Sequence, residues 1–142
     1  MAEAQGAGVV PTDVLVLEDD ELFRTTLAGA LESAGLRVRE ATGGREALSL
    51  LRESENFEIL LADRNLALGG DDLGDGFRVA EAAMHLWPSL GVIYMTGDVE
   101  ALEGRALGPR ERMIRKPFVA IELIELVRGL CSALAEASPT GG

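Results

Sequence analysis

Apolar residues along the chain form either short continuous runs or runs at helical spacing. Val14–Leu17 and Gly91–Met95 are continuously apolar, which is typical of strands buried on both faces. Less regular runs predict three more strands, at Leu36–Glu40, Phe57–Ala62 and Arg112–Arg115. Helical spacing predicts four helices, at 21–34, 42–53, 76–87 and 119–137. This alternation predicts parallel pairing with right-handed crossovers, and so a three-layer, doubly wound α/β fold with five strands.

Single residues indicate where these helices begin and end. Thr42 can cap the second helix, Gly35 suits the residue after the first, and Pro88 stops the third. Glycine and proline between 97 and 110 leave room for a short helix only. The last helix carries one apolar stripe, made of Ile121, Ile124, Val127, Cys131 and Leu134.

Length and composition favour one acidic globular domain. Of 142 residues, 47% are hydrophobic and 26% charged, and the net charge of −11 argues against nucleic acid or an anionic membrane as the main partner. We expect flexible tails at 1–12 and 138–142 around a domain at 13–137. No apolar stretch has the length of a membrane span or a secretory signal, and Cys131 is the only cysteine. These features predict a cytoplasmic protein.

The residues that follow the predicted strands carry most of the candidate chemistry. Carboxyl ends of parallel strands meet at one edge of the sheet, where ligands bind. Converging carboxylates repel one another unless a cation joins them, and oxygen ligands suit Mg²⁺. A hydroxyl and an ammonium group supply donors for phosphate oxygens. The strand ends therefore predict metal-assisted phosphoryl acceptance by the set Glu18, Asp19, Asp20, Asp63, Thr96 and Lys116.

Each of these residues also has a plainer interpretation. Asp19 or Asp20 can be a helix N-cap or a first-turn charge, and Thr96 can be a turn residue. Lys116 carries more information, because it is the only lysine among 13 basic residues. An exception among so many arginines indicates a need for a compact ammonium group. The joint placement at strand ends is what favours a site.

Four segments match known motifs in order and in approximate spacing. They are Val14–Asp20, Leu60–Asn65, Tyr94–Gly97 and Arg115–Phe118. With these motifs the chain resembles the receiver domains of two-component response regulators from residue 13 to residue 135. The resemblance implies a flavodoxin-like sheet with strand order 2-1-3-4-5.

By this resemblance Asp63 is the phosphoacceptor. It would take a phosphoryl group from a phosphohistidine on a sensor histidine kinase or a phosphotransfer protein. Glu18 and Asp19 match the acidic pair that holds Mg²⁺ together with Asp63, and the backbone carbonyl of Asn65 matches a further ligand.

Three further roles follow from the same resemblance. Thr96 matches the hydroxyl that binds the acyl phosphate, with the Gly97 backbone N–H nearby, and Lys116 matches the lysine that pairs with a phosphoryl oxygen. The Lys116–Pro117 bond is expected to be cis. Because only a few residues follow the last helix, we expect a stand-alone receiver. The resemblance also implies that the protein is not an enzyme. It would signal to an unknown downstream protein, by the family's habit through the fourth helix, fifth strand and fifth helix.

Two features depart from the family pattern. Met113 stands where the family has an aromatic switch residue, so Tyr94 either carries that coupling or, as we favour, is a plain strand residue. The loop 65–75 holds an insertion of Gly and Asp residues. It is interpreted as a solvated loop, because Leu73 interrupts the ligand pattern of a calcium-binding EF-hand.

Two alternative functions remain open. The first is a Mg²⁺-dependent phosphohydrolase with Asp63 as nucleophile, although Asn65 stands where such enzymes carry a second carboxylate. The second is a receiver-like adaptor that is never phosphorylated. A nucleotide-binding domain is disfavoured, because acidic residues replace the Gly-rich phosphate loop after the first strand.

Overall fold

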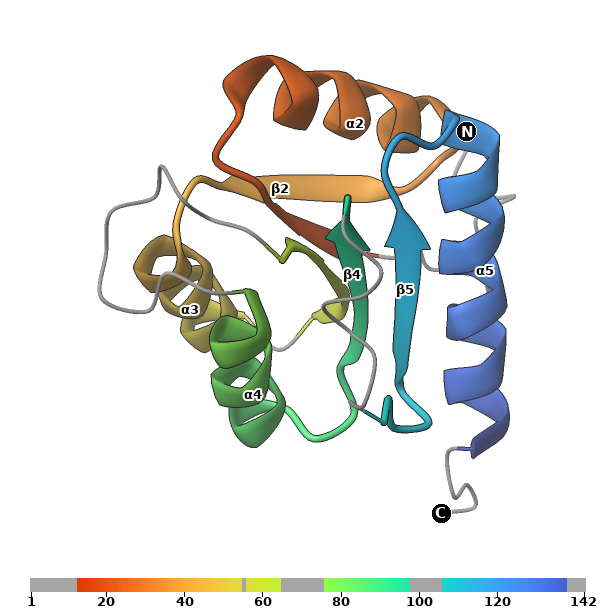
Figure 1. Cartoon of the computed structure of the whole chain (residues 1–142). Helices are drawn as coiled ribbons and strands as arrows, with labels where there is room; N and C mark the ends of the chain where they lie inside the picture. The colour runs from red at the N-terminus through yellow and green to blue at the C-terminus, as the bar shows by residue number, and fades with distance from the viewer. Residues whose placement is uncertain (1–12, 55, 65–75, 98–105, 138–142) are drawn as a thin grey trace, which may run out of the picture.

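The computed structural model of the chain describes residues 13–54, 56–64, 76–97 and 106–137. The predicted tails at 1–12 and 138–142 and the loop 65–75 lie outside these residues, as does most of the stretch expected to hold only a short helix. Strands and helices alternate as predicted (Figure 1). They are β1 (Asp13–Leu17), α2 (Glu21–Ser33), β2 (Arg37–Ala41), α3 (Gly44–Glu53), β3 (Phe57–Asp63), α4 (Gly76–Leu86), β4 (Gly91–Thr96), β5 (Glu111–Arg115) and α5 (Ala120–Ala137).

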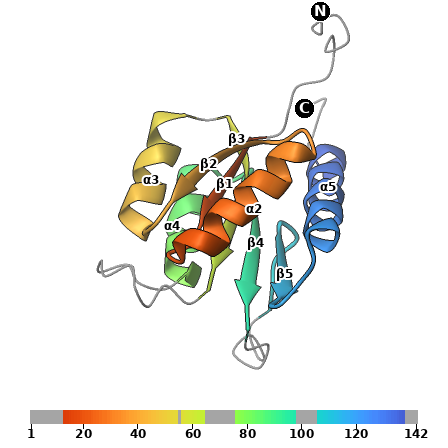
Figure 2. The same cartoon turned by 90° about the horizontal axis from the view of Figure 1, so that it is seen from above.

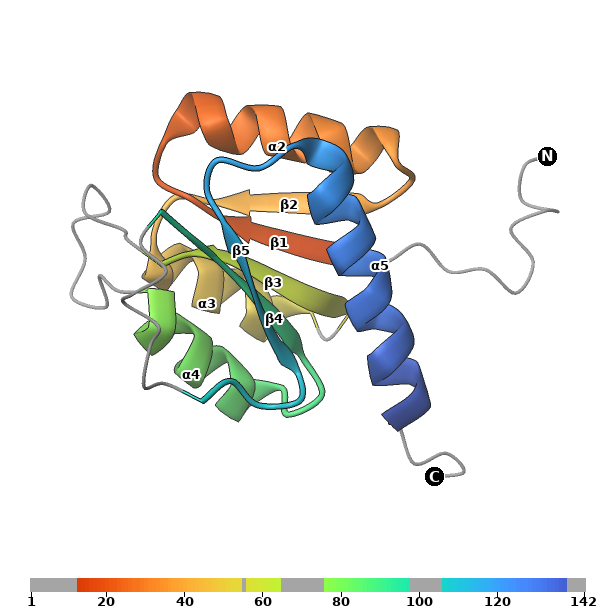
Figure 3. The same ribbon diagram turned by 45° about the vertical axis from the view of Figure 1, so that its right-hand side comes forward.

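The five strands form one parallel sheet in the order β2-β1-β3-β4-β5, which confirms the predicted topology. Helices α2 and α5 cover one face of the sheet, and α3 and α4 cover the other (Figures 2 and 3). This arrangement is the predicted three-layer sandwich. It brings the carboxyl ends of β1, β3, β4 and β5 to one edge.

Buried side chains on both faces of the sheet explain the continuous apolar runs. In β1, Leu15 and Leu17 pack on the side of α3 and α4, whereas Val14 and Val16 pack on the side of α2 and α5. All four are fully buried. The edge strands β2 and β5 carry more polar residues. Strand β2 begins and ends one residue later than predicted, and β5 begins one residue earlier.

The second predicted helix has a different N-terminus. Gly43, not Thr42, is the N-cap, with an extended backbone at φ −152° and no side-chain cap. Thr42 lies one residue further out, where its N–H and its hydroxyl both donate to the Glu46 carboxylate, at 2.9 and 3.2 Å. The prediction for Thr42 is therefore wrong by one position. The prediction for Gly35 is confirmed, because it follows the end of α2 with φ +94°.

The inward face of α5 also differs from the predicted stripe. Ile121 is 58% exposed, while Leu123, Val127 and Leu130 are buried. Cys131 is half-buried. Because apolar residues occur on several sides of α5, the sequence pattern did not determine its rotation.

Contacts between α3 and α4 close the layer on their side of the sheet. The indole N–H of Trp87, directly after α4, donates to the backbone carbonyl of Leu51 in α3 at 2.7 Å. None of the helices in the described part of the chain has the length and apolar character needed to cross a membrane.

Candidate functional site

Four predicted site residues lie at the same edge of the sheet. Glu18 directly follows β1, Asp63 ends β3, Thr96 ends β4 and Lys116 directly follows β5. Glu18, Asp63 and Thr96 are buried, at 1%, 5% and 3% exposure. Polar groups are rarely buried to this extent without a compensating partner, so this edge is chemically distinct from the rest of the core.

Three carboxylates converge at this edge. Oxygens of Glu18, Asp19 and Asp63 all lie within 4.8 Å of one another. Negative charges at such distances repel one another, and burial strengthens the repulsion. A set of carboxylate oxygens is the donor type that hard divalent cations prefer. The geometry therefore gives an acidic pocket that is consistent with a metal site.

Local hydrogen bonds fix Glu18. Its side chain accepts a bond from the Asp20 N–H at 3.0 Å, and its backbone carbonyl accepts one from the Arg24 guanidinium at 3.0 Å. Burial raises the pKa of Glu18 to about 7, and the charge of Asp63 adds to this rise. The Asp20 hydrogen bond and the Lys116 ammonium group lower the pKa but do not offset burial.

Lys116 supplies the positive charge of the pocket. Its ammonium group lies 3.1 Å from Glu18 Oε1 and 3.2 Å from Asp63 Oδ1. Burial on its own would lower the pKa of Lys116, but the charges of Asp63 and Glu18 raise it above its ordinary value. The ammonium group is therefore charged and bridges two of the three carboxylates.

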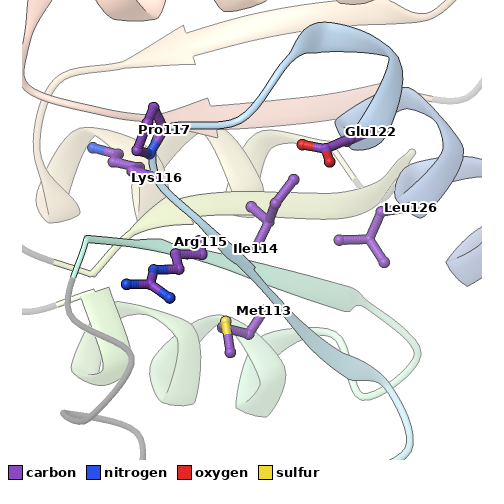
Figure 4. Close-up of a pocket in the computed structure, with 7 residues that line it drawn as sticks. All are labelled: Met113, Ile114, Arg115, Lys116, Pro117, Glu122 and Leu126. Carbon is purple, nitrogen blue, oxygen red and sulfur yellow. The ribbon is translucent and has the colours of Figure 1, made fainter.

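The backbone after β5 aims this lysine. The Lys116 N–H donates to the Thr96 carbonyl at 2.7 Å, so the two strand ends are joined. The Lys116–Pro117 bond is cis, the geometry that the sequence resemblance implied. Figure 4 shows the Lys116 side chain pointing away from Glu122 and Leu126 of α5.

The adjacent acidic residues Asp19 and Asp20 have separate positions. Asp20 is exposed and is the N-cap of α2, because its Oδ1 accepts the Phe23 N–H at 3.0 Å. Asp19 belongs to the carboxylate cluster instead. The plainer interpretation as a helix cap thus applies to Asp20 and not to Asp19.

No sequence pattern indicated that Phe23 lies at the site. The Lys116 ammonium group sits 4.7 Å from the centroid of its ring. The position of Phe23 fits the helical spacing of apolar residues in 21–34, and nothing in that spacing links it to the lysine that follows the last strand. Locally, Phe23 is distinguished only by being an aromatic residue three positions after the helix N-cap, Asp20.

Tyr94 and Met113 are paired across β4 and β5. Tyr94 is fully buried, packs edge-to-face on Phe77 with ring centroids 4.8 Å apart, and donates its hydroxyl to Glu111 Oε2 at 2.6 Å. Met113 is half-buried. Tyr94 is thus a core residue of its strand, as favoured from the sequence.

The remaining predicted residues flank this edge. Gly97 is exposed and directly follows Thr96, whereas Asn65 lies outside the described residues. Gly76, at the start of α4, approaches the end of β3 so closely that an added Cβ would overlap the Asp63 carbonyl oxygen. The site is therefore packed against α4 with no room for a larger residue at position 76.

Known sequences and structures resemble this chain over most of its length. The family profile described as "Response regulator receiver domain" matches residues 14–128. The response regulator receiver protein CpdR of Brucella abortus is 31% identical over 122 residues, which cover 84% of this chain and 97% of CpdR. A putative NtrX-like response regulator of Rickettsia typhi is 30% identical over 122 residues, but the chain spans only 25% of that longer protein.

Solved structures share the fold. A response regulator receiver protein from Sinorhizobium medicae has a TM-score of 0.76 at 21% identity, covering 87% of this chain and 97% of its own. The chemotaxis protein CheY4 of Vibrio cholerae has a TM-score of 0.72 at 23% identity, covering 85% and 99%. Together with the profile match and the CpdR relative, this means that the chain belongs to the response regulator receiver domain family.

Proposed function

We propose that this receiver accepts a phosphoryl group on Asp63. The observation that carries the proposal is a buried carboxylate at a strand end, with two further carboxylates and one ammonium group around it. An Asp63 oxygen would attack the phosphorus of a phosphohistidine. The new P–O bond forms as the P–N bond breaks. The electron pair of the P–N bond stays on the imidazole nitrogen, which takes up a proton.

The pocket has the ligands for a divalent metal ion. Glu18, Asp19 and Asp63 offer three carboxylate oxygens, which suit Mg²⁺, and the resemblance adds the backbone carbonyl of Asn65. When bound, Mg²⁺ supplies positive charge beside the transferring phosphoryl oxygens. The repulsion among the three carboxylates supports this assignment, because a cation of higher charge than the Lys116 ammonium group is needed to balance them.

The other strand ends supply donors for the phosphoryl group. Lys116 already contacts Asp63, so its ammonium group is placed to pair with a phosphoryl oxygen once Asp63 is modified. The Thr96 hydroxyl would bind the acyl phosphate, with the Gly97 N–H close by. Thr96 is buried at the end of β4, so its movement toward the phosphoryl group would also shift the end of that strand in the sheet.

Two kinds of partner follow from this function. The donor is a sensor histidine kinase or a phosphotransfer protein. The downstream partner is a protein that reads the phosphorylated state from the side of β5 and α5. There a groove is lined by residues of both elements, including Met113 and Leu126 (Figure 4), and Val119 and Ile121 are 60% and 58% exposed.

The alternatives are weaker on chemical grounds. Receivers are not classed as enzymes. A phosphohydrolase also needs an acid–base group beside the nucleophile, and Asn65 has no ionisable side chain. An adaptor that is never phosphorylated would hold the carboxylates of Glu18, Asp19 and Asp63 together at a cost in free energy, with no function that requires them.

Intact mass spectrometry tests the proposal. The pure protein is incubated with a small acyl phosphate donor, with Mg²⁺ or with a chelator. We expect one added phosphoryl group with Mg²⁺, and none with chelator or in Asp63→Asn. Asp20→Asn is the matched control, because it alters an exposed neighbouring carboxylate and should still be modified. A modified Asp63→Asn protein would refute the assignment, and an unmodified wild type would favour the adaptor.

A further inference from the structure

The Lys116 ammonium group has a third neighbour besides its two carboxylate partners. Its Nζ lies 4.7 Å from the centroid of the Phe23 ring. This is within the distance at which a cation is attracted to the negative face of an aromatic ring. The same ring packs edge-to-face with Phe118, with centroids 5.8 Å apart at an angle of 61°. Phe23 therefore contacts the ammonium group on one side and packs against a second ring.

The beginning of α2 fixes the position of this ring. The Phe23 N–H donates to the side chain of the N-cap residue Asp20 at 3.0 Å. Asp20 in turn donates its own N–H to Glu18 at 3.0 Å. A chain of two hydrogen bonds thus ties the Phe23 backbone to the acidic pocket. The segment after β1 therefore supplies two of the carboxylates, Glu18 and Asp19, and also positions the Phe23 backbone.

Phosphotransfer changes both ion pairs that hold Lys116. In the proposed function, Asp63 becomes bonded to phosphorus and Glu18 becomes a metal ligand, so both carboxylates exchange partners. The Phe23 ring takes part in neither exchange. A lysine side chain is long and has many rotamers, and 27% of the Lys116 side chain is exposed. Among the contacts that described residues make with the ammonium group, the ring is therefore the one that both exchanges leave in place.

We propose that Phe23 is a positioning residue, which keeps the Lys116 ammonium group at the pocket while Asp63 is phosphorylated. This role rests on the proposed function. The ring does not touch the phosphoryl group. It acts through Lys116, whose ammonium group then pairs with a phosphoryl oxygen.

A spectroscopic test uses the single lysine of the chain. Because Lys116 is the only lysine, labelling with ¹³C-lysine gives one set of side-chain NMR signals. The face of an aromatic ring moves nearby protons upfield, so we expect upfield-shifted ε-methylene protons in the wild type and in Phe23→Tyr. The shift should disappear in Phe23→Leu. Phe118→Leu is the matched control, since that ring belongs to the same cluster but the contact with the ammonium group is made by Phe23, and the shift should remain.

A kinetic test separates positioning from packing. With an acyl phosphate donor and saturating Mg²⁺, we expect Phe23→Leu to be phosphorylated about fivefold more slowly than the wild type. Phe23→Tyr should restore the rate, and Mg²⁺ affinity should stay the same in all variants. A ring-current shift that survives Phe23→Leu overturns the proposal. So does a normal rate in Phe23→Leu, or an equal loss in Phe118→Leu. If the wild type itself accepts no phosphoryl group, the proposed function fails, and this role fails with it.

Discussion

Replacing Glu18 with glutamine tests the electrostatics of the pocket directly. Glu18 is 1% exposed, and its burial raises its pKa from the ordinary 4.5 to about 7. In the folded chain the carboxyl group therefore holds its proton more tightly than in the unfolded chain. Between those two values, each rise in pH favours the unfolded state. The amide in Glu18→Gln is neutral at every pH and carries no such dependence.

The expected effect is large for a single side chain. Each pH unit between the two pKa values is worth about 1.36 kcal/mol, so ionising Glu18 costs the folded state about 3 kcal/mol in total. Part of this cost is already present at pH 5.5, and nearly all of it at pH 8. Glu18→Gln should therefore gain about 2 kcal/mol in free energy of unfolding, relative to the wild type, between pH 5.5 and pH 8.

Urea unfolding with a chelator present measures this difference. Comparing the two pH values cancels any fixed cost of the amide, and Glu32→Gln, on the exposed side of α2, is the control. Adding Mg²⁺ at pH 8 should stabilise the wild type more than Glu18→Gln, because the Glu18 carboxylate is a proposed ligand and the amide carries no charge. If the wild type and Glu18→Gln have parallel stability profiles from pH 5.5 to pH 8, the reasoning about burial is refuted.

Three further outcomes are expected. Asp19→Ala should weaken Mg²⁺ binding at least about tenfold in a metal titration. Asp20→Ala should instead lower the free energy of unfolding by about 1 kcal/mol, because it removes a helix cap. Equal losses of Mg²⁺ affinity in the two variants would contradict this. Thr96→Ala should abolish the amide chemical-shift changes that a phosphoryl mimic causes away from the pocket. Met113→Ala should preserve these changes, because the flexible methionine side chain fits both the modified and the unmodified state. The reverse pattern would assign the switch to Met113. Gly76→Ala should destabilise the fold by more than about 2 kcal/mol in urea, because the new Cβ overlaps the backbone of β3; a neutral effect would mean that α4 shifts freely.

The sheet was predictable because its interior strands are buried on both faces. Val14–Leu17 and Gly91–Met95 are continuous apolar runs, and the structure places them in β1 and β4. The edge strands β2 and β5 mix polar and apolar residues, which do not mark the strand ends, so the observed limits differ from the predicted ones by one residue. The order of the strands came from the family resemblance and could not be read from periodicity.

Helix details depended on choices that the pattern left open. Thr42 was the predicted N-cap of α3, but Gly43 is the N-cap, and Thr42 instead donates its N–H to the Glu46 side chain. In α5, apolar residues surround much of the helix, so packing against the sheet selects Leu123 and Val127, and leaves Ile121 in solvent.

The site was predictable where it depends on strand ends and not where it depends on packing. Glu18, Asp63 and Lys116 meet because parallel strands end at one edge, a rule that applies before any contact is known. The contact between Phe23 and Lys116 depends on how α2 lies over the end of β5. That is a tertiary relation between residues far apart in the sequence, which no local pattern encodes.

The hydrogen bond from Trp87 to α3 gives the protein a reporter at the far end of α4. Trp87 is the only tryptophan, so indole fluorescence arises from one place. With 11 residues in α4, that place lies about 16 Å along the helix axis from Gly76, which packs against Asp63. A change in emission on phosphorylation would therefore mean that the whole length of α4 moves. Constant emission would confine the rearrangement to the edge where the strands end.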